Sequence, residues 1–250
     1  MSTAAPEAIY IYGVVSDDGS GGLGPGIGGA PVCEVVGDGL AALVSHVTEE
    51  EIVLGREAMS MHARVLEHAA QYGTVLPMRF GVVMEGEAAV KRRVLDAHHD
   101  ELAQQLGELE GKVEVRLRAT YEEETLMREV IREDQEIAQI RRSLRRVSED
   151  ATYYDRIRLG ELVAAAVERK RAADTAAIFE ATAPLALDTR VAQSAHEWMA
   201  FDGSFLVARG RLPEFDAKIE AVGETQAGRM RLKYTGPLPP YSFVELAKEV

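Results

Sequence analysis

The sequence predicts an α+β fold of two domains, and three observations support that prediction. The chain has 250 residues, which is more than a typical single domain. Runs of β-branched and aromatic residues fill the first fifty positions and recur in the last third of the chain, whereas helix-forming residues dominate 122–184. We therefore predict an N-terminal α+β domain over residues 1–110 and a C-terminal α+β domain over 111–250 that contains a helical insertion over 122–184.

Three strands are predicted in the first fifty residues. The run from Ile9 to Val15 is β-branched and aromatic, and a glycine-rich loop follows it. Two more apolar runs, 32–36 and 40–47, are separated by Gly-Asp-Gly, which is typical of a hairpin turn. A helix is expected from Glu49 to about residue 72, because Thr48 can cap it and apolar residues recur at three- and four-residue intervals.

The next segments predict an edge strand, a helix and a further strand. Pro77 places the extended run 75–81 at a sheet edge or at the entry to a strand. Beyond residue 86 one helical stripe is formed by Val90, Val94, Leu95, Leu102, Leu106 and Leu109. The run 112–118 alternates strictly, which predicts a strand with its valine and leucine side chains inward and its charged side chains outward.

The region 122–184 predicts two antiparallel helices. Its first half has apolar residues at heptad spacing, interrupted at Glu133, and a weak break follows at 148–150. The heptad stripe fits either a seam between these two helices or an intermolecular zipper. The remainder predicts a strand over 204–209, a helix from Pro213 and a strand over 230–234. The order β, helical hairpin, β, α, β is that of a modified ferredoxin-like fold with an enlarged first crossover, although no fourth strand is evident.

The acidic composition limits the class of partner. The 41 acidic residues outnumber the 28 basic residues, and the net charge of −13 repels nucleic acid and anionic bilayers at long range. We expect neither as a partner. The single cysteine, Cys33, excludes an internal disulfide and a CxxC zinc site, and we expect it to be buried in its strand. The short apolar run 9–15 and the acidic residues before it fit no secretory leader, so we expect a cytoplasmic protein.

The motifs that would indicate chemistry are rejected on context. The glycine tract between residues 19 and 29 opens no helix and lacks the lysine of a phosphate loop. His98 and His99 point about 100° apart on a helix, and Ser45 and His46 face opposite sides of a strand. The acidic runs 49–51 and 122–124 fit helix caps better than paired catalytic carboxylates. We expect no catalytic residue, no cofactor site and no metal site.

A basic cluster in the helical insertion is the one concentrated positive patch. It consists of Arg141, Arg142, Arg145 and Arg146. It has no interleaved aromatic residues for base stacking. These arginines fit either a solvated helix face that pairs with Glu133, Glu136 or Glu149, or a surface that binds an acidic partner.

At the motif level the chain resembles the gas vesicle protein family GvpF/GvpL. The resemblance rests on the opening Ile-Tyr-Ile-Tyr-Gly-Val from Ile9, the segment Val-Leu-Pro-Met-Arg-Phe-Gly ending at Gly81 with its leucine-rich helix, the strand opening Lys-Val-Glu at Lys112, and the ending Tyr-Thr-Gly-Pro-Leu-Pro-Pro-Tyr-Ser-Phe from Tyr234. The motif residues with a structural or partner-binding role are expected to be Pro77, Arg79, Phe80, Gly81, Gly236, Pro237, Pro239, Pro240, Tyr241 and Phe243.

The resemblance implies a non-enzymatic accessory protein of gas vesicle assembly, located in the cytoplasm and at the vesicle. It implies two α+β domains, the second ferredoxin-like, and partners among the vesicle proteins, above all the small and very apolar shell protein. No small-molecule substrate is expected. Such a protein could keep shell subunits from associating before they enter the wall and aid vesicle nucleation.

Two other functions remain open at this stage. A small-molecule enzyme or sensor would need convergent polar residues in a ferredoxin-like pocket, for which Arg79, Tyr121 and His196 are the candidates. A structural oligomer would use the heptad stripe. Within the motifs, alternation places Arg79 on the opposite face from Met78 and Phe80. If its guanidinium forms a buried fork to a carboxylate, Arg79→Lys should lower thermal stability. The prolines near the end are expected to hold an extended backbone, with Tyr241 and Phe243 either clamping the tail to the protein or offering a docking surface.

Overall fold

The computed structural model describes residues 8–18, 21–48, 55–144, 153–193 and 196–245. The chain divides into two compact units. The first contains the described residues of Met1–Glu114, Ala208–Gly210 and Gly236–Val250, and the second contains those of Val115–Val207 and Arg211–Thr235. The second unit thus differs from the predicted domain over 111–250 at the end of the chain. Residues 236–245 group with the first unit because Ser242 binds the buried Glu114 there.

The first unit contains a five-stranded antiparallel sheet. Its strands are β1 (Ala8–Ser16), β2 (Cys33–Val36), β3 (Leu40–Val47), β4 (Val75–Pro77) and β5 (Val83–Glu85). They follow the order β2-β3-β1-β4, with β5 also paired to β1. Pro77 therefore lies in an edge strand, as its missing N–H predicted.

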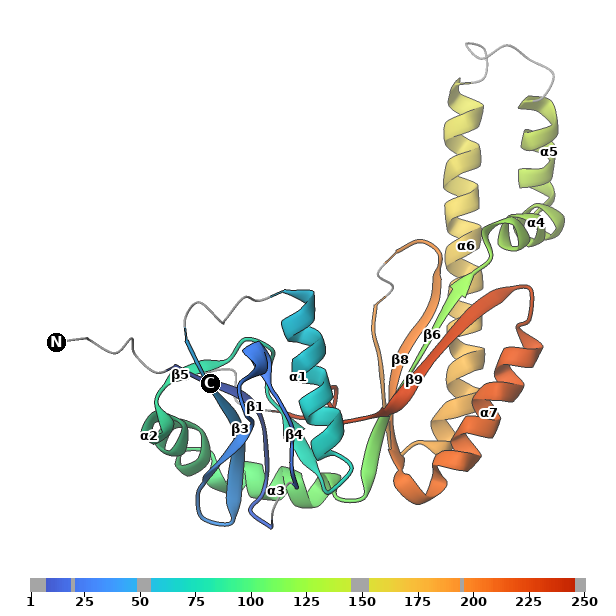
Figure 1. Ribbon diagram of the computed structural model, residues 1–250. Coiled ribbons are helices and arrows are strands. Elements are labelled where there is room, and N and C mark those ends of the chain that lie inside the picture. The colour runs from blue at the N-terminus through green and yellow to red at the C-terminus, as the bar shows by residue number, and fades with distance from the viewer. Residues whose placement is uncertain (1–7, 19–20, 49–54, 145–152, 194–195, 246–250) are drawn as a thin grey trace. The chain divides into compact units, whose positions relative to one another are not determined.

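Helices lie on both faces of this sheet (Figure 1). They are α1 (Arg56–Ala69), α2 (Glu87–Val90), the π-helical turn η2 (Lys91–Asp96) and α3 (His99–Leu109), and a 3₁₀ turn η1 spans Ile27–Gly29. Tyr10 and Tyr12 pack with α1, while α3 contacts β1 and β4. Because β1 is buried on both faces, its sequence shows a continuous apolar run instead of alternation.

Several expectations for the first unit need correction. Cys33 is exposed, because β2 is an edge strand in which only Val35 is buried. The predicted start of the first helix at Glu49–Glu51 lies outside the described residues, and α1 begins at Arg56. The helix after residue 86 is divided into α2, η2 and α3. Its six predicted stripe residues are all buried.

The second unit contains a four-stranded antiparallel sheet. Its strands are β6 (Lys112–Tyr121), β7 (Asp188–Val191), β8 (Met199–Ala208) and β9 (Met230–Leu238), in the order β7-β8-β6-β9. Its helices are α4 (Glu123–Glu133), α5 (Gln135–Leu144), α6 (Tyr153–Thr182) and α7 (Leu212–Thr225), with 3₁₀ turns η4 (Ala183–Leu185) and η5 (Arg209–Arg211). β6 begins in the first unit, and β9 ends in it.

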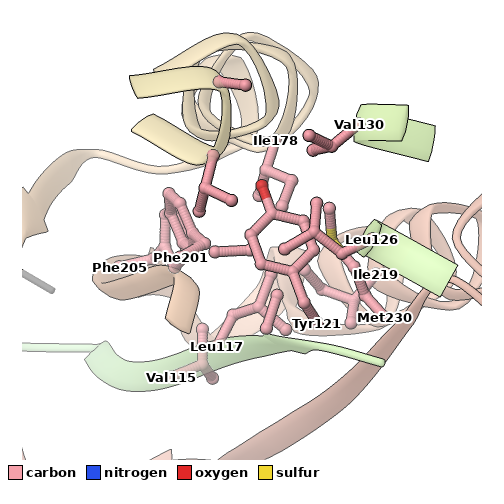
Figure 2. Close-up of a cluster of buried hydrophobic side chains, with 14 of the residues drawn as sticks. Val115, Leu117, Tyr121, Leu126, Val130, Ile178, Phe201, Phe205, Ile219 and Met230 are labelled. Atoms are coloured by element: carbon pink, nitrogen blue, oxygen red, sulfur yellow. The ribbon is translucent and has the colours of Figure 1, made fainter. Parts of the chain in front are cut away.

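The core of the second unit lies between the sheet and its helices. Figure 2 shows side chains of β6 and β8, such as Leu117 and Phe205, packed with Leu126 and Val130 of α4, Ile178 of α6 and other helical residues. The alternation of β6 holds on this face. On its other face, however, Glu114 is buried in the first unit, against the expectation that the charged residues point outward into solvent.

The helical insertion differs from the expected pair of helices. A break at Asp134 separates α4 from α5, and the Asp134 carboxylate accepts hydrogen bonds from the N–H groups of Glu136 and Ile137, at 3.0 and 3.2 Å. The predicted break at 148–150 lies outside the described residues.

The fourth strand that the sequence did not reveal is β7, whose Asp-Thr-Arg-Val sequence is polar because it lies at the sheet edge. In the described part of the chain no helix is long and apolar enough to span a membrane.

Candidate interaction surfaces

The N-terminal half of α6 and α5 form a helical arm, which we define as residues 135–144 and 153–167. Figure 1 shows these helices side by side and extending beyond the end of the sheet of their unit. The arm is closed along one side by Ile137, Ala166 and Val167, which are buried. This is the seam that the heptad stripe predicted within the hairpin.

The tip of the arm exposes large apolar side chains. Tyr153 and Tyr154 are 63% and 83% exposed, and Ile157, one turn further along α6, is 44% exposed. The two tyrosine rings contact each other edge to face, with 5.5 Å between their centroids. Tyrosine is enriched among the residues that dominate binding energy at protein interfaces. None of these three residues was predicted as a binding residue, although two adjacent tyrosines at a helix start were a visible signal in the sequence.

The predicted basic cluster lies partly on this arm. Arg141 and Arg142 are exposed on α5, whereas Arg145 and Arg146 lie outside the described residues. Arg142 Nε donates to the carbonyl of Ala138 at 3.1 Å. Neither Arg141 nor Arg142 forms an ion pair with a carboxylate of the described residues. For Arg141 and Arg142 the alternative of pairing with Glu133 or Glu136 is wrong, because those carboxylates bind other cations, including Lys170 and Arg158. Glu149, the third acid of that alternative, lies outside the described residues.

A half-buried ionic network anchors the helical insertion to its sheet. Arg229 Nε lies 2.9 Å from Glu129 Oε1 of α4, and its two terminal nitrogens donate to Asp174 of α6 at 2.8 and 2.7 Å. Tyr121 of β6 donates to the same aspartate at 2.6 Å. Lys170 completes the network by contacting Glu129 at 3.1 Å. One arginine thereby joins two helices of the insertion to the strands.

The same network determines the protonation of its members. Its hydrogen bonds to Asp174 raise the pKa of Arg229 despite burial, so the guanidinium stays charged. Burial, together with the bond to Asp174, raises the pKa of Tyr121. The hydroxyl of Tyr121 therefore stays protonated and donates its hydrogen bond to Asp174. This arginine network was invisible in the sequence, since Arg229 is 55 positions from Asp174 and 100 positions from Glu129.

The C-terminal family motif folds back on the first unit. Ser242 donates to Glu114 through its N–H and its hydroxyl, both at 2.7 Å, and Phe243 is buried. Pro239 and Pro240 are also buried, whereas Tyr241 is partly exposed. Of the two alternatives for the motif, Phe243 therefore fits the one in which the tail is clamped to the protein.

The backbone of this motif is extended through Pro237 and Leu238 of β9, as its prolines predicted, but it turns from Pro239 onward. The N–H of Tyr241 donates to the carbonyl of Pro239 at 2.8 Å, and that of Phe243 donates to the carbonyl of Pro240 at 3.0 Å. These bonds form consecutive turns, which turn the chain so that Ser242 reaches Glu114. Gly236 and Pro237 precede them as exposed residues of β9.

The other family motif surrounds a buried tyrosine. Gly81, in a left-handed conformation with φ of 93°, donates its N–H to the Tyr10 hydroxyl at 3.0 Å. Phe80 contacts the ring of Tyr10, and Met78 is buried. Arg79 points the other way and is exposed, with no ion pair to a described residue. The hypothesis of a buried fork at Arg79 is therefore wrong, because the side chain is exposed just after β4 ends at Pro77.

Beside this motif lies a buried polar cluster of tyrosine, histidine and serine. The Tyr10 hydroxyl contacts His62 Nδ1 at 2.9 Å, and the Tyr12 hydroxyl donates to Ser45 Oγ at 3.0 Å. Ser45 in turn donates to the carbonyl of Pro31 at 3.0 Å. Burial lowers the pKa of His62 to about 4, against a weaker effect of the Met78 main chain. The cluster fills the core and faces neither of the cavities described next.

The residues named for a small-molecule site do not converge. Arg79 is in the first unit and exposed, Tyr121 is engaged by Asp174, and His196 is exposed in the second unit. Two cavities, of about 690 and 320 Å³, lie in the first unit, and none of these three residues lines either. Within the described ranges no group of three histidine, cysteine or acidic residues could hold a metal ion.

The comparisons with known proteins cover nearly the whole chain. The family model of gas vesicle synthesis protein GvpL/GvpF matches residues 8–245. Gas vesicle protein F of Streptomyces sp. (strain CB03234) is 36% identical over 242 residues, which cover 94% of this chain and 99% of that protein. Gas vesicle protein F of Dolichospermum flosaquae is 24% identical, covering 95% of this chain and 98% of that protein.

Solved structures agree on the fold. The crystal structure of gas vesicle protein GvpF from Anabaena sp. PCC7120 superimposes with a TM-score of 0.83 at 22% identity, covering 96% of this chain and 99% of that one. GvpF from Microcystis aeruginosa gives a TM-score of 0.79 at 23% identity, with the same coverage.

Proposed function

Since the chain belongs to the GvpL/GvpF family of gas vesicle synthesis proteins, we propose that it is a non-enzymatic accessory protein of gas vesicle assembly. In this proposal it works in the cytoplasm and at the vesicle, where it binds the small apolar shell protein and other vesicle proteins. Binding limits aggregation of shell subunits before they enter the wall and aids vesicle nucleation. The proposal needs no cofactor, metal or substrate.

The exposed tip of the helical arm is the observation that carries this proposal. An apolar partner is held by burying apolar surface, at about 25 cal/mol per Å² removed from water. Tyr153, Tyr154 and Ile157 offer such surface, whereas most large apolar side chains of the described chain are in its cores. The neighbouring Arg141 and Arg142 add charge that steers an acidic region of a partner toward the arm.

The ferredoxin-like description of the second unit is part of the proposal. Its support is the element order β6, helices, β7, β8, α7, β9, which is β-α-β-β-α-β with an enlarged first helical segment. The insertion replaces the first crossover helix. A sheet covered by helices on one face provides a rigid base from which the arm presents its tip.

Co-purification with a co-expressed shell protein tests the proposal. The triple variant Tyr153→Ser, Tyr154→Ser, Ile157→Ser should lose most of the shell protein while keeping its circular dichroism spectrum. Tyr72→Ser is the matched control, because Tyr72 is similarly exposed, at 59%, but lies in the first unit. Binding should survive EDTA. Full retention by the triple variant, or loss on adding EDTA, contradicts the proposal.

The arginines of the arm are tested separately. The double variant Arg141→Glu, Arg142→Glu should weaken the same complex most strongly at low salt, because exposed charges are screened over about 10 Å at 0.1 M salt. The melting temperature should change by no more than a few degrees, because neither arginine pairs with a described carboxylate. Unchanged binding by a folded double variant removes these two residues from the docking surface.

A further inference from the structure

The face of the second sheet that points away from the helical core has basic side chains on three of its four strands. On β6 the core side is formed by Val115, Leu117 and Ala119, so Arg116 and Arg118 point to the other face. On β9 Met230 and the partly buried Leu232 face the core, which places Arg231 and Lys233 opposite them.

The register of β7 adds a fifth basic residue to this face. Arg190 pairs directly with Ser204 of β8, and directly paired residues of antiparallel strands share a face. Ser204 and Asp202 alternate with Phe201 and Phe205, which face the core. Asp202 accepts two hydrogen bonds from Arg116, both at 2.8 Å, which confirms that β8 and β6 present these residues on one side. We call this surface the basic sheet face, defined as Arg116, Arg118, Arg190, Arg231 and Lys233.

The basic sheet face has more positive charge than its own acidic residues neutralise. Asp202 is 7% exposed and is shared by two arginines, since Arg118 Nε also lies 3.4 Å from it. Arg231 pairs with Glu122 at 2.9 Å but stays 79% exposed. Lys233 is exposed and forms no ion pair with a described residue. Asp188 is the other acid that the strands place on this face. With Glu122, the partner of Arg231, the face has five basic residues against three acidic ones, which stands out in a chain of net charge −13.

We infer that the basic sheet face binds an acidic segment of a partner polypeptide. Arginines held by Asp202 are pre-ordered, and their remaining donors match the geometry of further carboxylates. The aromatic side chains Phe201, Phe205 and Tyr234 of this sheet all point to the core, so the face offers no base-stacking platform for nucleic acid. Four strands about 4.8 Å apart span about 15 Å, which matches an extended segment of about five residues.

This site is separate from the arm and goes beyond the proposed function. The arm offers exposed apolar side chains, whereas the basic sheet face offers ordered cations. A vesicle protein with both an apolar region and an acidic segment could occupy both. The two sites are tested with different probes, so a negative result for one site does not contradict the proposal for the other.

Fluorescence anisotropy of the full chain with labelled hexaglutamate tests the site. Labelled hexaserine is the uncharged probe. Hexaglutamate should bind and hexaserine should not, and affinity should fall as sodium chloride is raised from about 50 to about 300 mM. The double variant Arg118→Gln, Lys233→Glu should weaken hexaglutamate about tenfold. It retains the paired bonds between Arg116 and Asp202, so it should fold.

Two controls make the result decisive. Lys218→Glu makes the same charge change as Lys233→Glu on exposed α7, in the helical layer of the same unit, and should leave affinity within about twofold. The triple arm variant should bind hexaglutamate like the parent chain. No hexaglutamate binding, equal weakening by Lys218→Glu, or stronger binding of a six-nucleotide single-stranded DNA would each overturn the inference.

Discussion

Acid stability tests the buried polar cluster around His62. Tyr10 accepts a hydrogen bond from the N–H of Gly81, which leaves its own hydroxyl hydrogen for His62 Nδ1 at 2.9 Å. This assigns the proton of the neutral imidazole to Nε2, which has no hydrogen-bond partner in the described structure. A second proton, on Nδ1, would point at the hydroxyl hydrogen that Tyr10 donates, and this hydrogen bond would be lost. The folded state therefore favours neutral histidine.

The magnitude follows from the two pKa values of this histidine. His62 is 4% exposed, and burial lowers its pKa from the ordinary value of 6.5 to about 4. Between these values the unfolded chain binds the proton more readily than the folded chain, so stability decreases as the pH falls. The cost is small at pH 7.5, about 2 kcal/mol at pH 5, and levels off near 3 kcal/mol below pH 4, at about 1.4 kcal/mol per pKa unit.

Urea unfolding at pH 7.5 and pH 5 measures this cost against the variant His62→Gln. Glutamine can still accept from Tyr10 but does not titrate, so the variant should lose about 2 kcal/mol less between the two pH values than the parent chain. Other titrating groups cancel in the difference. Equal losses in the two proteins, or a midpoint near 6.5 for the His62 ring protons in an NMR titration, would refute the reasoning.

Four further variants test particular contacts. Arg229→Lys cannot reproduce the fork to Asp174 and should lower the free energy of unfolding by about 1–3 kcal/mol, measured in urea. Glu114→Ala should release the tail, so that limited proteolysis cuts within 239–245. Gly26→Ala places its Cβ 2.1 Å from the Tyr12 hydroxyl and should cost about 1–3 kcal/mol in the same assay. Arg79→Lys should leave the melting curve unchanged, and a melting temperature lower by several degrees would instead support a buried fork from Arg79 to a carboxylate.

The sequence predicted those elements whose environment is encoded locally. The stripe from Val90 to Leu109 is buried throughout, because residues three and four apart necessarily share a helix face. β1 was recognised as a strand because burial on both faces demands a continuous apolar run. The break at Glu133 was also visible, since a charged residue interrupts the heptad pattern there.

Errors arose where burial depends on a distant segment. Glu114 is buried because Ser242, 128 positions away, provides its hydrogen bonds. Cys33 is exposed because no strand pairs with β2 on its outer side in the described sheet. β7 was missed because an edge strand needs no apolar alternation, and its pairing with β8 provides its stability.

The same limit applies to the candidate surfaces, as two neighbouring arginines illustrate. Arg229 and Arg231 are two positions apart, and alternation alone would give them the same environment. Arg229, however, precedes β9 and turns toward Glu129 and Asp174, where it holds the insertion in place. Arg231 lies within the strand and stays exposed on the basic sheet face. Identical side chains are therefore either built into an ionic network or left exposed according to where the strand begins, which depends on long-range pairing. Replacing each by lysine should consequently lower stability at Arg229 and leave it nearly unchanged at Arg231.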